Sequence, residues 1–215
     1  MDKCLLSFQY NLEPVDKVKR SGIARELGTA YHSSMENLYE GAEDERGPAL
    51  ASERVALAHA ALDDQLGLVD EMIWMPACPD VDTAKEILTK MLEAYMASPD
   101  AVWPVWGNDR TWRVIGTEMK LDYEDPELTG PYSQEVNKMG GIPDLVLEEI
   151  ASGWIYVVDH KTAGKKWPRG KEHPRKNNQA PSYVPMIRRL YPDAPGYGFA
   201  FDIMTYKGEF ERRLS

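Results

Sequence analysis

The chain has 215 residues, of which 43% are hydrophobic and 28% are charged, a composition typical of one globular domain over residues 1–215. Its formal net charge of -10 argues against a protein that coats nucleic acid by bulk attraction, because neutralising phosphates requires an excess of Lys and Arg. The sequence contains no apolar run of about eighteen residues and no secretory signal at its N-terminus, so we expect a cytoplasmic protein that does not engage a membrane.

Cysteine content and the absence of one motif exclude two kinds of cofactor. Cys4 and Cys78 are too few for a zinc or iron–sulfur site built from four thiolates, and in a reducing cytosol we expect no disulfide between them. The sequence also lacks a G-x-x-x-x-G-K-[ST] phosphate-binding loop, which predicts that this chain carries no ATP-driven motor.

Helical patterns dominate the first half of the chain. Apolar residues recur at near-helical spacing between Ser21, a suitable cap, and Gly41, a suitable stop, so a helix is predicted there. His32 would lie inside this helix. Two more helices are predicted over about 48–68 and 82–97, separated by loops that contain proline.

Extended patterns follow in the second half. Runs rich in Val, Ile, Trp or Tyr predict strands over 112–121, 142–149 and 154–160. A short link that contains glycine joins the last two runs, which favours an antiparallel hairpin. A helix over about 177–190 and a strand over 197–206 complete the predicted elements.

The order of these elements predicts the fold class. Helices, then three strands, then a helix and a strand indicate an α/β protein with a mixed central β-sheet flanked by helices. We expect a helical N-terminal portion over about 1–100 and a catalytic α/β core over about 101–215.

Two acids and a lysine are predicted to converge at the end of the strand pair. Asp144 closes the segment Gly-Ile-Pro-Asp, and fifteen residues later Asp159-His160-Lys161 ends an apolar run. Because side chains alternate along a strand, Asp159 and Lys161 share one face and His160 points to the other. Paired carboxylates suit a hard divalent cation, and a neighbouring lysine can stabilise charge on a phosphate. A lone D-x-K tripeptide is common and often only a surface ion pair, so its context decides.

Four short motifs occur in order along the chain. They are G-T-x-x-H at 28–32, G-x-x-D at 141–144, D-x-K at 159–161 and Q-x-x-x-Y at 179–183. This series resembles the RecB-like, phage-type exonuclease family of the PD-(D/E)XK nuclease superfamily, and the resemblance spans about residues 22–206. It implies a restriction-endonuclease-like core.

The resemblance implies a metal site. Its ligands would be His32, Asp144, Asp159 and the backbone carbonyl of His160, and they would hold one or two Mg²⁺ or Mn²⁺ ions. An imidazole beside carboxylates favours Mn²⁺ relative to an all-carboxylate site.

The same resemblance implies a catalytic set. Lys161 would be the catalytic lysine beside Asp144 and Asp159. Gln179 and Tyr183, one helical turn apart, would organise the site and touch DNA. Glu118 resembles an acid that the family often places on the strand before G-x-x-D, although a solvent-facing glutamate explains it equally well.

A basic strip follows the D-x-K motif. Seven basic residues between 161 and 176, opposed only by Glu172, give this segment a charge of +6 and leave about -16 for the rest. It is either a solvated loop or a surface for DNA, with Trp167 available to stack on a base. Beyond Lys161, the predicted nucleic-acid-binding residues are Lys165, Lys166, Trp167, Arg169, Lys171, Arg175 and Lys176.

The function that the resemblance implies is hydrolysis of DNA. An exonuclease that acts on linear duplex or single-stranded DNA in recombination or repair is the first expectation, and a structure-specific or nicking endonuclease is the second. A recombinase or helicase partner, a homo-oligomer and a bacterial or phage-infected host cell would suit it. From another class, the chain could be an inactive module that binds nucleic acid or protein.

Overall fold

A computed structural model of the chain describes residues 20–39, 51–99, 101, 111–129, 136–165 and 179–214. The first half of the chain contains three helices, namely α2 (Ile23–Tyr39), α3 (Ala51–Gly67) and α4 (Val81–Ala97). Asp80 caps the last of them, since its carboxylate accepts a hydrogen bond of 2.8 Å from the backbone N–H of Thr83. All three helices were predicted, with ends within a few residues of those observed.

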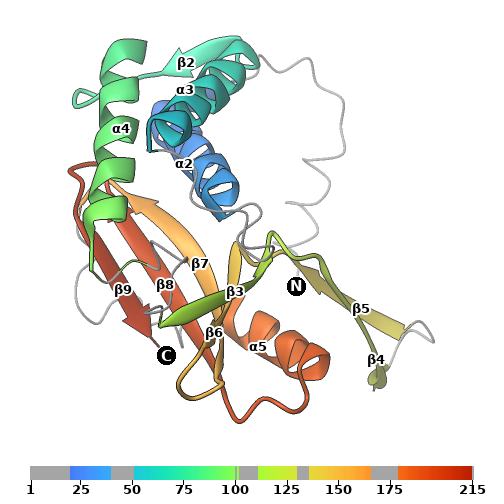
Figure 1. Cartoon of the computed structure of the whole chain (residues 1–215). Helices are drawn as coiled ribbons and strands as arrows, with labels where there is room; N and C mark the ends of the chain where they lie inside the picture. The colour runs from blue at the N-terminus through green and yellow to red at the C-terminus, as the bar shows by residue number, and fades with distance from the viewer. Residues whose placement is uncertain are drawn as a thin grey trace.

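A mixed five-stranded sheet forms the centre of the molecule (Figure 1). Its spatial order is β3-β6-β7-β8-β9, in which only β7 and β8 run parallel. The expected hairpin is present as the antiparallel pair β6–β7. The strands are β3 (Trp112–Thr117), β6 (Leu145–Glu149), β7 (Ile155–Ala163), β8 (Tyr197–Thr205) and β9 (Phe210–Leu214).

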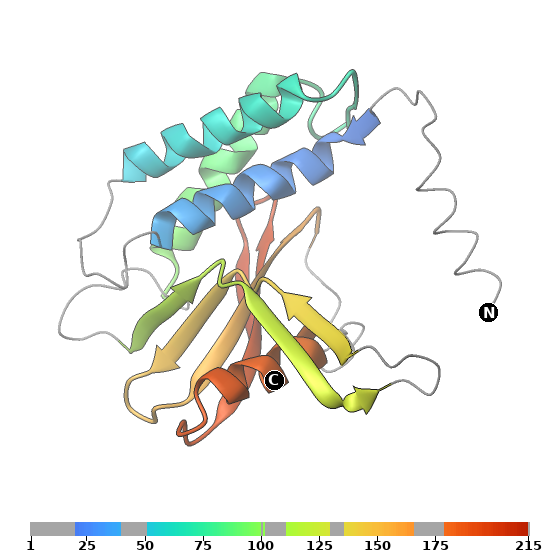
Figure 2. The same cartoon turned by 90° about the vertical axis from the view of Figure 1, so that its right-hand side faces the viewer.

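Helices cover both faces of this sheet, as Figure 2 shows. The layer of α2, α3 and α4 buries one face, with Leu145, Val158 and Ala200 among the residues that pack beneath it. Helix α5 (Gln179–Leu190) lies on the opposite face, where it joins the parallel strands β7 and β8. The predicted fold class, a mixed sheet flanked by helices, is therefore confirmed.

Two small sheets stand outside this core. Strand β1 (Arg20–Gly22) pairs in parallel with β2 (Glu71–Ile73). Strands β4 (Leu121–Thr129) and β5 (Val136–Gly141) pair antiparallel and project from the body (Figures 1 and 2). Within the described ranges, no helix is both long and apolar enough to cross a membrane.

Several strand boundaries differ from prediction. The run 112–121 is not one strand, because β3 ends at Thr117 and Glu118 adopts a positive φ of 46° that breaks the extended backbone. The run 142–149 is extended in the main sheet only from Leu145, so Asp144 precedes β6. Strands β4, β5 and β9 were not predicted, because charged residues interrupt the apolar alternation in β4 and β9, and β5 ends in two glycines that are unfavourable in strands.

Candidate active site

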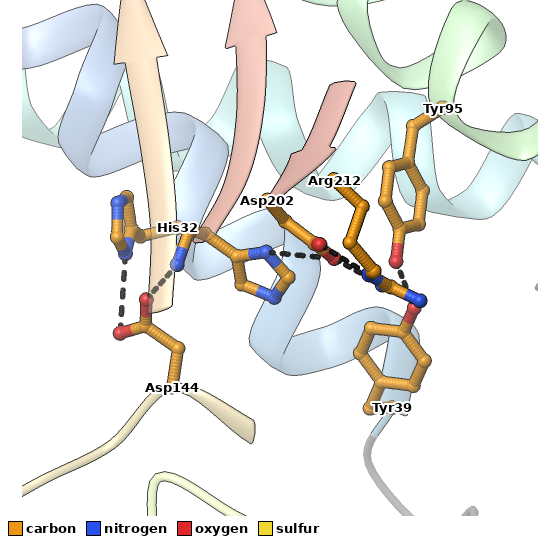
Figure 3. A network of polar contacts seen from close by, with 7 residues as sticks. His32, Tyr39, Tyr95, Asp144, Asp202 and Arg212 are labelled. Carbon is orange, nitrogen blue, oxygen red and sulfur yellow. Dashed lines mark hydrogen bonds and ion pairs between the residues drawn. The ribbon is translucent and has the colours of Figure 1, made fainter. Parts of the chain in front are cut away.

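Asp144 lies where three segments of the chain meet. It follows the β4–β5 hairpin and directly precedes β6. One carboxylate oxygen, Oδ2, accepts a hydrogen bond of 2.5 Å from the backbone N–H of His160 in β7. The other oxygen, Oδ1, lies 3.4 Å from Nδ1 of His32 in α2 (Figure 3). Asp144 therefore connects the helical layer to the D-x-K strand.

Close packing of α2 on β7 brings His32 to this place. Gly28, one helical turn before His32, faces Thr162, and a Cβ atom at Gly28 would lie only 3.1 Å from the Thr162 hydroxyl oxygen. A larger side chain would push the helix and strand apart. The glycine of the G-T-x-x-H motif thus lets the helix carry its histidine to the carboxylate.

Asp159 and Lys161 lie on the face of β7 that α5 covers. Lys161 Nζ is 2.5 Å from Asp159 Oδ2, and the side chain of Asp159 is 5% exposed while that of Lys161 is 27% exposed. The ammonium group also lies 5.9 Å from the centre of the Phe201 ring. A buried carboxylate therefore has a cation that can still reach solvent or a ligand.

His160, between these two residues, has its side chain on the opposite face among aromatic rings. Its backbone carbonyl belongs to β7 at the level of the two acids. The alternation of a strand thus separates the side chain of His160 from those of its neighbours.

Glu118 reaches the site from a turn and not from the predicted strand. Its backbone N–H donates a hydrogen bond of 3.2 Å to the carbonyl oxygen of Asp144. Partial burial, followed by the negative charges of Asp144 and Glu36, raises the pKa of Glu118 to about 7. Glu36, one helical turn beyond His32, was not recognised in the sequence.

Electrostatics in the cluster reflect a surplus of negative groups. Burial raises the pKa of Asp159, an effect that Lys161 opposes and Asp144 reinforces. Burial would also raise the pKa of Asp144, but its hydrogen bonds with His32 and with the His160 N–H lower it. Burial lowers the pKa of His32, yet its interaction with Asp144 outweighs this and the pKa is raised. The carboxylates are partly shielded from solvent, and Lys161 and His32 compensate only part of their negative charge.

Tyr183 packs against the segment that leads to Asp144. A Cβ atom at Gly141 would lie 2.2 Å from Cε1 of Tyr183, so only glycine fits there with this ring position. The Tyr183 hydroxyl donates a hydrogen bond of 3.4 Å to the carbonyl of Ile142. Gln179 is the first residue of α5, and its side chain lies outside the described residues.

The predicted basic strip is described only at its start. Lys165 is exposed two residues after the end of β7. The remaining residues of the strip lie outside the described part of the chain, namely Lys166, Trp167, Arg169, Lys171, Arg175 and Lys176.

The donor chemistry of the cluster fits a divalent cation. In the described ranges, no three His, Cys, Asp or Glu side chains are already arranged as a metal cage. However, Asp144, Asp159 and Glu118 offer carboxylate oxygens, and His32 offers a ring nitrogen beside them. Oxygen ligands with one imidazole suit Mg²⁺ or Mn²⁺. A cation would also relieve the repulsion from neighbouring carboxylates that adds to the effect of burial on the pKa of Glu118.

Comparison with known proteins agrees with this chemistry. The family model of the PD-(D/E)XK nuclease superfamily matches residues 2–211, and the chain belongs to that superfamily. Nucleases of this superfamily generally use divalent metal ions. No curated protein matches the chain. Among solved structures, the crystal structure of SSO0001 matches with 13% identity and a TM-score of 0.33, covering 99% of this chain and 76% of that one.

Proposed function

We propose that the chain is a Mg²⁺- or Mn²⁺-dependent deoxyribonuclease of the RecB-like branch, with Asp144, Asp159 and His32 as metal ligands. The observation that supports this most is the convergence of the three groups. Asp144 contacts His32 and the backbone N–H of His160 in β7. The same strand carries Asp159 and Lys161, which form an ion pair on the face opposite to the His160 side chain. The carbonyl of His160 is a further proposed ligand, since it lies on the same strand.

Phosphodiester hydrolysis needs a water oxygen to attack phosphorus while the bond to the leaving oxygen breaks. A bound divalent ion supplies charge neutralisation at the phosphate and lowers the pKa of a coordinated water. Lys161 is proposed to hold the attacking water and to stabilise negative charge on the phosphate oxygens. Its half-buried ammonium group beside Asp159 suits that role, because it is anchored and yet accessible.

Three further residues are proposed to support this step. Glu118, whose partly buried carboxylate faces the charge of Asp144, is proposed to contact the metal ion or a water molecule beside it. Tyr183, which contacts Gly141 and hydrogen-bonds to Ile142, is proposed to hold the segment before Asp144. Gln179, one turn earlier on α5, is proposed to contact DNA.

Digestion from DNA ends is the proposed mode of action. This rests on the order of the four sequence motifs, which resembles that of the RecB-like exonucleases, and on the basic strip over residues 161–176. Recombination or repair is the proposed setting, with a recombinase or helicase as a partner and with homo-oligomerisation as one way to enclose DNA.

An assay with different DNA forms tests the proposal. The protein is incubated with linear, circular and single-stranded DNA labelled at either end, in Mg²⁺, Mn²⁺ or EDTA, beside Lys161→Ala. We expect metal-dependent loss of linear DNA only, reduced by about a hundredfold or more in the variant. Cut circles would replace the exonuclease with a structure-specific or nicking endonuclease. Intact DNA in every sample would favour an inactive binding module.

A further inference from the structure

A row of buried polar side chains crosses the sheet directly behind the D-x-K motif. His160 of β7 is in register with Asp202 of β8, and Asp202 is in register with Arg212 of β9. The row lies on the sheet face that α2 and α4 cover, since the His160 ring packs beside Tyr39 of α2 and Tyr95 of α4. His160 and Asp202 are each 1% exposed. Burying such groups costs free energy, and the chemistry proposed above uses none of the three side chains.

Asp202 and Arg212 satisfy each other. The guanidinium group donates two hydrogen bonds to the two carboxylate oxygens, at 2.6 Å and 2.5 Å. This fork geometry compensates both buried charges. A one-residue slip of β8 would move Asp202 to the apolar face beneath α5, so the pair also fixes the register of the strands.

The imidazole of His160 is held by packing. Its Nδ1 lies 3.8 Å from Asp202 Oδ2, which is too long for a hydrogen bond. Its ring lies among three tyrosines, with centroid separations of 6.3 Å to 6.5 Å from Tyr31, Tyr39 and Tyr95. The hydroxyls of Tyr39 and Tyr95 hydrogen-bond to each other, which closes this enclosure (Figure 3).

The backbone of the same residue contacts the candidate active site. The His160 N–H donates to Asp144 Oδ2, and the adjacent residue in the strand is Asp159. A displacement of β7 at His160 would therefore change the hydrogen bond to Asp144 and the spacing between the two carboxylates together.

We propose that the buried ring of His160 is a positioning element for Asp144. The tyrosine enclosure and the Asp202–Arg212 pair hold the ring from behind, and the ring fixes the backbone N–H that orients the carboxylate. The role of His160 is thus distinct from that of its carbonyl, and any residue with a well-packed ring should fulfil it in part. This inference rests on the proposed function, because it assigns the row to the metal-binding acids.

The test compares His160→Ala, His160→Asn and His160→Phe with the wild-type protein. Mn²⁺ affinity is measured by titration of the intact protein without DNA, and the single-turnover rate is measured at saturating Mn²⁺. We expect His160→Ala and His160→Asn to lose about ten- to a hundredfold in Mn²⁺ affinity or rate, with the affinity for DNA nearly unchanged. His160→Phe should recover most of this loss, because it restores the ring.

Met204→Ala is the matched control. Met204 is buried on the same face of β8, one alternation beyond Asp202, and its truncation also leaves a cavity in the same core. We expect it to lower the melting temperature while the Mn²⁺ affinity of the folded protein stays within about twofold, below the range expected for the His160 variants. Equal losses of Mn²⁺ affinity in this control and in His160→Ala would overturn the positioning role. Wild-type Mn²⁺ affinity and rate in His160→Asn would overturn it as well.

Nuclear magnetic resonance of the wild-type protein gives a result that does not depend on folding of the His160 variants. The amide proton of residue 160 should resonate far downfield and move upfield in Asp144→Ala. An amide chemical shift of residue 160 that stays unchanged in Asp144→Ala would refute the inference. Failure of the wild-type protein itself to bind Mn²⁺ or to cut DNA would instead contradict the proposed function.

Discussion

Removing one partner of the Asp202–Arg212 pair should destabilise the protein far more than removing both. Asp202 is fully enclosed and Arg212 is 9% exposed at its side chain, and the pair makes two short hydrogen bonds. Arg212→Met leaves a buried carboxylate without its cation, a change that costs about 3–5 kcal/mol. In a chain of this size that corresponds to a melting temperature lower by about 6–20 °C.

The double variant Asp202→Leu/Arg212→Met separates charge from packing. It replaces both ions with apolar side chains of similar volume, and such replacements are often neutral or stabilising. We therefore expect its free energy of unfolding, measured with urea, to exceed that of Arg212→Met by several kcal/mol. A single variant within about 1 kcal/mol of the wild type, or a double variant less stable than the single one, would show that the buried carboxylate does not depend on its cation.

Further predictions concern the candidate active site. Glu118 has a pKa of about 7 in the folded chain and an ordinary pKa near 4.5 when unfolded, so the folded state binds more protons between these two pH values. The free energy of unfolding of the metal-free protein should therefore fall as pH rises through this range. In Glu118→Gln, the urea midpoints measured at the two ends of the range should lie closer together. Gly141→Ala should displace the Tyr183 ring and slow DNA cleavage. The double variant Gly141→Ala/Tyr183→Ala should cleave DNA no more slowly than Tyr183→Ala alone, because the ring that the new methyl group would meet is absent. A wild-type cleavage rate in Gly141→Ala would contradict the close contact. Gly28→Ala should raise the free energy of unfolding by up to about 1 kcal/mol in the Thr162→Ala background, where the facing hydroxyl is absent, and by less in the wild-type background. Equal effects of Gly28→Ala on thermal unfolding in the two backgrounds would exclude the coupling between residues 28 and 162.

Local sequence patterns predicted most of the core, because the apolar residues of each helix or strand recur at the spacing of that element. The apolar spacing of α2 and the apolar run of β7 are both local signals, and the short link between β6 and β7 allowed only a hairpin. The convergence of Asp144 with β7 followed from that hairpin, since adjacent strands bring their ends together.

The remaining features depend on contacts that no local pattern encodes. The turn at Glu118 is set by a positive φ that is uncommon for glutamate. Strand β9 has Glu211, Arg212 and Arg213 in five residues, so it lacks the apolar alternation of a strand. The partnership of Arg212 with Asp202 depends on strand register, although a lone acid inside the apolar run of β8 was a signal that could have been recognised.

The rate of DNA hydrolysis in Mn²⁺ by Asp159→Asn, compared with wild type and Glu148→Gln, tests whether cleavage depends on the proposed metal site. Glu148 lies on neighbouring β6 and pairs with Arg113, so it is an acid of the same sheet outside the cluster. The proposed metal site requires a loss of about a hundredfold or more in Asp159→Asn and a wild-type rate in Glu148→Gln. Metal-dependent cleavage that persists unchanged in Asp159→Asn would contradict it.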